Sequence, residues 1–94
     1  MTAQPDGLIS VLLDLSAPVD ERDDAAMDLG DYDAALPTLI EAARNLSEDD
    51  IVAASLGASI GEIWQRRGGF DAALVESLHP QARHELLERF GDAS

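Results

Sequence analysis

The sequence predicts a small all-α domain, and three observations support this prediction. Apolar residues recur at spacings of three and four through most of the chain, which is the period of one helix face. Gly and Pro fall between these periodic segments, where they end helices. The composition is 46% hydrophobic but only 4% aromatic, so the core must be aliphatic. With 94 residues, the chain has room for one domain, residues 1–94, around one small core.

The first half of the chain predicts three helices. Pro18 ends the first, because the residue before a proline is pushed out of the helical region. The apolar block of this first segment is short, so a strand is the alternative there. Gly30 is a natural end for the second helix, and Asp33 is expected to cap the third, with Pro37 near its first turn. These helices cover about residues 8–15, 20–29 and 34–45.

The second half predicts three more helices. The longest runs to about Arg67 after a capping-box-like segment at 47–50, and it carries one stripe of large apolar residues and one of small residues. Gly57 and Gly61 in the small stripe cost roughly 1 kcal/mol each relative to Ala, so we expect a neighbouring helix to approach closely there. Asp71 caps a short fifth helix, through about residue 78, and Pro80 begins the sixth, which ends at residue 91.

An internal repeat groups these helices into pairs. The segment Gly30-Asp-Tyr-Asp-Ala-Ala-Leu36 recurs 38 residues later as Gly68-Gly-Phe-Asp-Ala-Ala-Leu74, with five of seven positions identical. Periods of this size are typical of helix-pair repeats, in which each unit buries its apolar face against its neighbours. The sequence therefore predicts three stacked helical hairpins, at about residues 6–29, 33–67 and 70–91.

Three stretches carry a resemblance to a known family: Arg22-Asp-Asp-Ala-Ala-Met-Asp-Leu-Gly30, Ala35-Leu-Pro-Thr-Leu-Ile-Glu-Ala42 and Val52-Ala-Ala-Ser-Leu-Gly57. Over about residues 8–67 the chain resembles bacterial HEAT-like repeats of the phycocyanobilin-lyase type. The segment 68–74 is similar to a tetratricopeptide hinge, although Pro80 departs from that pattern. Both resemblances imply a short solenoid of helix pairs that binds another protein, and neither implies lyase activity, because only the scaffold is shared.

The charge of the chain is strongly acidic and unevenly distributed. The formal net charge is -13, and residues 14–50 hold twelve acidic against two basic residues. Such a charge opposes nucleic acid and anionic lipid, and favours a basic protein partner. The same excess is also explained by ordinary solvation or by adaptation to salt, without any partner.

The candidate partner-binding residues follow from this distribution. The acidic candidates lie on the second helix and in the turns that flank the third. Trp64, which two arginines follow, has a core position as its first interpretation and an interface anchor as its second. The complete set is Asp23, Asp24, Asp28, Asp31, Asp33, Asp49, Asp50 and Trp64.

Motifs for chemistry are weak in this chain. It contains no Cys, and it has no phosphate-binding or dinucleotide-binding loop. His84 and Glu88 are spaced like two metal ligands on a helix, but a pair without a third ligand is typical of a surface contact. The aspartates at 28, 31 and 33 lack the Gly and Glu of a calcium loop. We therefore expect no enzymatic activity, no cofactor and no metal site.

The function hypotheses rank in this order. The first is a protein-binding domain with a basic partner, in its sharpest form an immunity or antitoxin-type inhibitor of a bacterial toxin. The second is a small adaptor that associates with itself or with further repeats near Trp64. The last is a lyase-like or metal-dependent enzyme that uses His79 and His84. No apolar run is long enough for a membrane span and no export signal is apparent, so a cytoplasmic location is expected; the oligomeric state stays open.

Overall fold

The computed structural model describes residues 5–45, 50–69 and 71–91, and within these ranges the fold is all-α, as predicted. It contains no strand in the described part, so the strand alternative for the first segment is wrong. Two short 3-10 turns, η1 and η2, connect the second and third α-helices. The elements in chain order are α1 (Asp6–Leu13), α2 (Val19–Asp28), η1 (Leu29–Asp31), η2 (Asp33–Ala35), α3 (Leu36–Asn45), α4 (Asp50–Arg67), α5 (Ala72–Glu76) and α6 (Pro80–Gly91).

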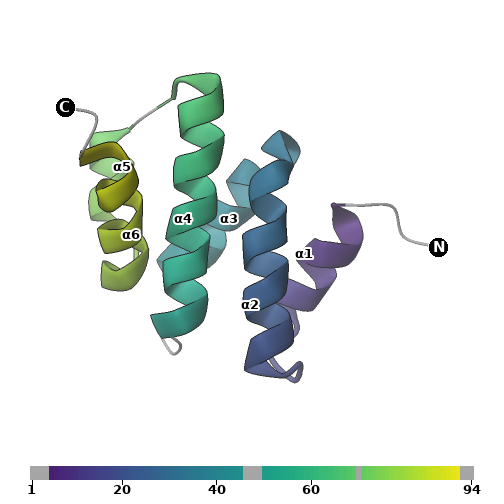
Figure 1. Ribbon diagram of the computed structural model, residues 1–94. Coiled ribbons are helices and arrows are strands. Elements are labelled where there is room, and N and C mark those ends of the chain that lie inside the picture. The colour runs from purple at the N-terminus through teal and green to yellow at the C-terminus, as the bar shows by residue number, and fades with distance from the viewer. Residues whose placement is uncertain (1–4, 46–49, 70, 92–94) are drawn as a thin grey trace.

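The longest helix, α4, lies at the centre of the molecule (Figure 1). It packs against α6 on one side, against α2 on the other and against α3 behind, while α1 packs on α2. The molecule measures 41 × 26 × 18 Å. This arrangement gives α4 three neighbours, and most of its residues are accordingly buried.

The core is aliphatic, as the composition predicted. Its largest fully buried side chains come from five helices and from η1: Leu12, Leu29, Leu39, Val52, Leu56, Ile60, Ile63, Val75 and Leu86. Alanines fill the narrow spaces where helices meet, including Ala25, Ala26, Ala43, Ala53 and Ala82. Trp64 is the one large aromatic residue among the described core residues.

The α4–α6 contact confirms the close approach predicted at Gly57. A Cβ atom added to Gly57 would lie only 2.0 Å from the carbonyl oxygen of Ala82 and 2.8 Å from its Cα. Both are backbone atoms of α6, so no side-chain rotation could relieve the clash. Gly57 is therefore required by the packing of α6 on α4 and not by its own backbone conformation, since Gly68 is the one described residue with a positive φ.

Polar side chains from α4 fix its contact with α2. The buried Ser59 Oγ donates a hydrogen bond to the carbonyl oxygen of Ala26 at 2.5 Å. One turn earlier, Ser55 Oγ donates to the carboxylate of Asp23. The two hydroxyls lie four residues apart on one face of α4, so they follow the α2–α4 contact along its length.

Several helix boundaries differ from those predicted. The first helix ends at Leu13, two residues early, because Asp14 closes a turn in which its carboxylate accepts hydrogen bonds from the Ser16 backbone N–H at 3.0 Å and from its Oγ at 2.6 Å. The fifth α-helix ends at Glu76 instead of 78. The proposed capping segment 47–50 falls mostly outside the described residues.

The Ser16 hydroxyl and the Ser16 backbone N–H together lower the pKa of Asp14. Desolvation acts against this shift, and the positive charge of Arg22 adds a smaller lowering. These contacts stabilise the ionised carboxylate within the turn. The charge on Asp14 is therefore part of the turn that joins α1 to α2.

The two copies of the repeated seven-residue segment differ in structure. Asp71 caps α5 as predicted, since its carboxylate accepts a hydrogen bond from the Leu74 N–H at 3.1 Å. The equivalent Asp33 is the first residue of η2, whose N-cap is Tyr32, so Asp33 does not occupy the N-cap position of the third helix that was predicted for it. Its carboxylate instead accepts from Arg66 Nε at 3.1 Å, and α3 begins only at Leu36. The six helices fall near the expected ranges, while the solenoid arrangement of the repeat stays a prediction.

Candidate functional site

A shallow groove runs along α4 between α2 and α6. Its volume is about 460 Å³, and its floor consists of α4 residues at helical spacings of three and four, so they share one face. One residue of α2 and two of α6 form its sides. The lining residues are Met27, Ile51, Ala54, Ser55, Ala58, Gln81 and Glu85.

Two large apolar side chains stand exposed at this groove. Met27 on α2 is 57% exposed, and Ile51 in the first turn of α4 is 61% exposed. Between them the floor has only small side chains, Ala54 and Ala58 among them. A trough of small residues with large apolar residues beside it is the kind of surface that another apolar side chain can fill.

Acidic residues surround Met27 on the outer face of α2. Asp20, Asp23 and Asp24 precede Met27 by seven, four and three residues, which places them on the same face of the helix. Asp20 and Asp24 are exposed, as are Asp28 and Asp31 beyond them. The groove therefore has a dense row of carboxylates along its α2 side. We call the groove and this row together the α2–α4–α6 surface.

Two of the predicted binding aspartates have partners within the protein. Asp23 accepts the hydrogen bond from Ser55, and Asp33 forms an ion pair with Arg66. The Arg66 guanidinium also donates to the backbone carbonyl of Gly30 at 2.9 Å, so it connects α4 to the turns between α2 and α3. Asp33 therefore serves the structure, while Asp23 lies at the groove and is held in place there.

The remaining predicted binding residues divide into three groups. Asp24, Asp28 and Asp31 are exposed and form no ion pair with a described residue. Asp49 lies outside the described residues, as does the side chain of Asp50. Trp64 is only 5% exposed, because its place on the large apolar stripe of α4 turns it into the core. The interpretation of Trp64 as a core residue is confirmed, and its interpretation as an exposed anchor for a partner is wrong.

Sequence reasoning missed both exposed apolar residues of the groove. Met27 sits among acidic residues in the sequence, and this polar setting is itself a signal that a large apolar side chain faces solvent. Ile51 lies next to the apolar stripe that begins at Val52, and only the packed structure separates the exposed residue from the buried one.

The two histidines make local contacts. His84 Nε2 lies 3.2 Å from the Glu88 carboxylate, with both side chains exposed. His79 Nδ1 accepts a hydrogen bond from the Gln81 backbone N–H at 3.1 Å, just before α6. Among the described residues, no group of three or more His, Asp or Glu side chains is arranged to hold a metal ion.

In the described ranges, none of the helices combines the length and apolar character needed to cross a membrane. Comparison of the chain with protein-family models, with curated proteins and with solved structures found no match.

Proposed function

We propose that this chain is a non-enzymatic protein-binding domain, and that its α2–α4–α6 surface binds a basic, amphipathic helix of a partner protein. One observation carries the proposal: exposed Met27 and Ile51 stand over a floor of small residues, directly beside a row of carboxylates. This combination of an apolar trough with a one-sided charge suits a helix that has one apolar and one basic face.

The contacts that such a helix would make follow from its spacing. Apolar side chains at every third or fourth position would enter the trough over Ala54 and Ala58, where the small floor residues permit a close approach. Lys or Arg side chains on the adjacent face would then reach Asp20, Asp24 and Asp28. The Ser55 hydrogen bond holds Asp23 at the edge of the trough, so its carboxylate needs no further ordering when a partner arrives.

Charge supports the choice of a basic partner. The chain carries a formal net charge of -13, and the row on α2 concentrates part of it on one face. Complementary charges of this kind accelerate association by about 10 to 1,000-fold at low ionic strength. The exposed position of the carboxylates predicts that salt acts mainly on the association rate.

A more specific form of this proposal is an immunity or antitoxin-type inhibitor. A toxin that acts on nucleic acid needs a basic surface, and carboxylates on α2 would occupy the places that phosphates take. The adaptor hypothesis loses the anchor on which it depended, because Trp64 is buried in the core.

The test uses a synthetic amphipathic peptide of Leu and Lys, 18 residues long like α4, with a Leu/Glu peptide as its charge-reversed counterpart. Fluorescence anisotropy is expected to show binding of the basic peptide alone, weaker by at least about tenfold when salt rises from roughly 50 to 200 mM. Equal binding of both peptides would contradict the proposal.

Matched variants locate the contact. The triple variant Asp20→Asn, Asp24→Asn, Asp28→Asn is expected to bind the Leu/Lys peptide much more weakly than Asp6→Asn, Glu41→Gln, Glu76→Gln, which removes the same charge elsewhere. Met27→Gln is expected to weaken binding, while Leu87→Gln, at another exposed apolar residue, leaves it unchanged. Equal losses in both triple variants would show that net charge acts without a defined surface.

A further inference from the structure

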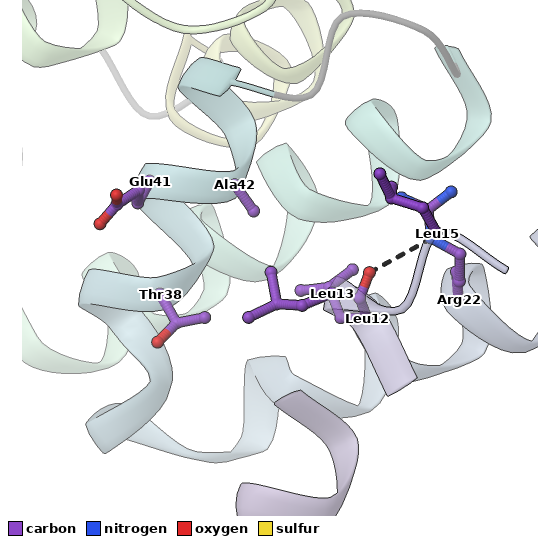
Figure 2. A pocket seen from close by; sticks show the side chains of 7 residues that line it. All are labelled: Leu12, Leu13, Leu15, Arg22, Thr38, Glu41 and Ala42. Atoms are coloured by element: carbon purple, nitrogen blue, oxygen red, sulfur yellow. Dashed lines mark hydrogen bonds between the residues drawn. The ribbon is translucent and has the colours of Figure 1, made fainter. Parts of the chain in front are cut away.

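A second pocket lies on a different side of α2, where the end of α1 faces α3 (Figure 2). Its volume is about 470 Å³, within the range of roughly 300–1,000 Å³ that small-molecule sites occupy. Arg22 reaches it from a position about 140° around α2 from Met27, so this pocket is separate from the α2–α4–α6 surface. The lining residues are Leu12, Leu13, Leu15, Arg22, Thr38, Glu41 and Ala42.

The guanidinium of Arg22 is the distinctive group of this pocket. The residue is only 6% exposed, and its Nε donates a hydrogen bond to the Leu12 carbonyl oxygen at 3.2 Å. Its Nη2 is buried without a hydrogen-bond partner. A buried cation with an unsatisfied hydrogen-bond donor destabilises the folded protein, and a bound acceptor would offset this effect.

The acidic residues nearby do not supply that acceptor. Asp14 is close enough for the charge of Arg22 to lower its pKa slightly, but its carboxylate is hydrogen-bonded to Ser16. Glu41 lines the pocket from α3, and in Figure 2 its carboxylate lies at the end away from Arg22. The guanidinium therefore remains without an anionic partner among the described side chains.

Apolar side chains form the walls beside the guanidinium. Leu13 and Leu15 are 54% and 73% exposed, although both belong to the pocket. Leu15 comes from the turn between α1 and α2 and lines the pocket together with Arg22 (Figure 2). Because Leu15 is mostly exposed, its side chain can change rotamer with little loss of packing when a ligand enters the pocket.

We propose that this pocket binds a small aliphatic monocarboxylate, with the carboxylate on the Arg22 guanidinium and the tail between the exposed leucines and α3. A guanidinium and a carboxylate form strong, charge-assisted hydrogen bonds, which here would satisfy the buried Nη2. The apolar walls require a ligand with an aliphatic body. Arg22 is the one basic residue among the lining residues and the protein is acidic, so a ligand with one negative charge is favoured over one with several.

The test compares octanoate with octanamide, which has the same tail and no charge, on the unchanged protein at neutral pH. Calorimetric titration is expected to give octanoate an affinity at least about tenfold higher than that of octanamide. In NMR spectra, octanoate should shift the Arg22 Nε–Hε signal more than that of any other arginine. Equal affinities, or no binding of octanoate, would overturn the proposal.

Three variants test the assignment to Arg22. Arg22→Met should lose the preference for octanoate over octanamide, whereas Arg67→Met, which removes an exposed arginine, should keep it. Thr38→Leu places a larger side chain on the α3 side of the pocket and should weaken the binding of both octanoate and octanamide. This test keeps Arg22 and therefore does not depend on how stable the Arg22→Met protein is. Octanoate binding that is unchanged in Thr38→Leu would place the ligand elsewhere, and equal losses in both arginine variants would show a general effect of charge.

Discussion

The contact between α4 and α6 at Gly57 predicts a destabilising effect for a substitution that normally stabilises a helix. In an ordinary helix, Gly→Ala is favourable by about 1 kcal/mol. At Gly57 the new methyl group would lie 2.0 Å from the Ala82 carbonyl oxygen, whereas ordinary contacts begin at 3.4 Å. The backbone of α6 must therefore move by more than 1 Å, which separates Ala82 and Leu86 from the core.

The magnitude follows from this forced displacement. Overpacking costs typically 1–3 kcal/mol, and a clash with backbone belongs at the upper end, about 3 kcal/mol. After the gain in helix propensity, Gly57→Ala is expected to lower the free energy of unfolding by about 2 kcal/mol. For a domain of this size, that corresponds to a fall in Tm of about 8–16 °C.

Two other glycines provide matched controls for this substitution. A Cβ at Gly69 would meet Trp64 at 3.4 Å, an ordinary contact, so Gly69→Ala should be neutral or stabilise slightly. At Gly30 the closest atom, at 2.7 Å, belongs to the flexible Glu62 side chain, which predicts an intermediate effect. Thermal unfolding followed by circular dichroism gives the order. A Gly57→Ala protein as stable as Gly69→Ala would refute the close approach of α6.

Two further predictions concern polar contacts. Arg66→Ala should lower the free energy of unfolding by about 0.5–1.5 kcal/mol, because it removes the ion pair with Asp33 and the hydrogen bond to Gly30, while Arg67→Ala should change it by less than about 0.5 kcal/mol; urea unfolding measures both, and equal effects would contradict a role for this link. Because the pKa of Asp14 is lowered in the folded protein, the stability that its carboxylate adds is present at neutral pH and is lost as pH falls through the lowered pKa. Ser16→Ala removes the hydroxyl that is the main cause of the shift, so it should raise the pKa of Asp14 toward its ordinary value; NMR titration of the Asp14 carboxyl group tests this, and an unchanged midpoint would contradict it.

The helices and their contact at Gly57 could be predicted because local pattern determines them. Spacings of three and four place Leu56, Ile60 and Ile63 on one face, and this face is buried in the structure. Pro80 begins α6, as its missing N–H predicts, and Asp71 caps α5. The faces and caps depend on residues within one helix or a few positions apart. The glycine at position 57 indicated only that some helix comes close there, and the structure shows that this helix is α6.

Features that depend on distant residues were not predictable in the same way. Asp33 and Asp71 occupy equivalent positions in the repeated segment, yet an arginine 33 residues away binds Asp33 and removes it from the capping role. Arg22 looks like a solvated charge on an acidic helix, and only the packing of α1 and α3 around it creates the pocket. The α2–α4–α6 surface likewise needs three helices before Met27 and Ile51 stand at one groove.

The central position of α4 has a consequence for how the molecule opens. Because α4 contacts α2, α3 and α6, detaching any of these helices exposes part of its apolar surface to water. Local opening is therefore costly around α4, and its interior amides should exchange their hydrogens most slowly, near the rate of global unfolding. The five-residue α5 makes few contacts with the other helices and should exchange first. The helices packed on α4 are therefore expected to unfold together, with α4 opening last.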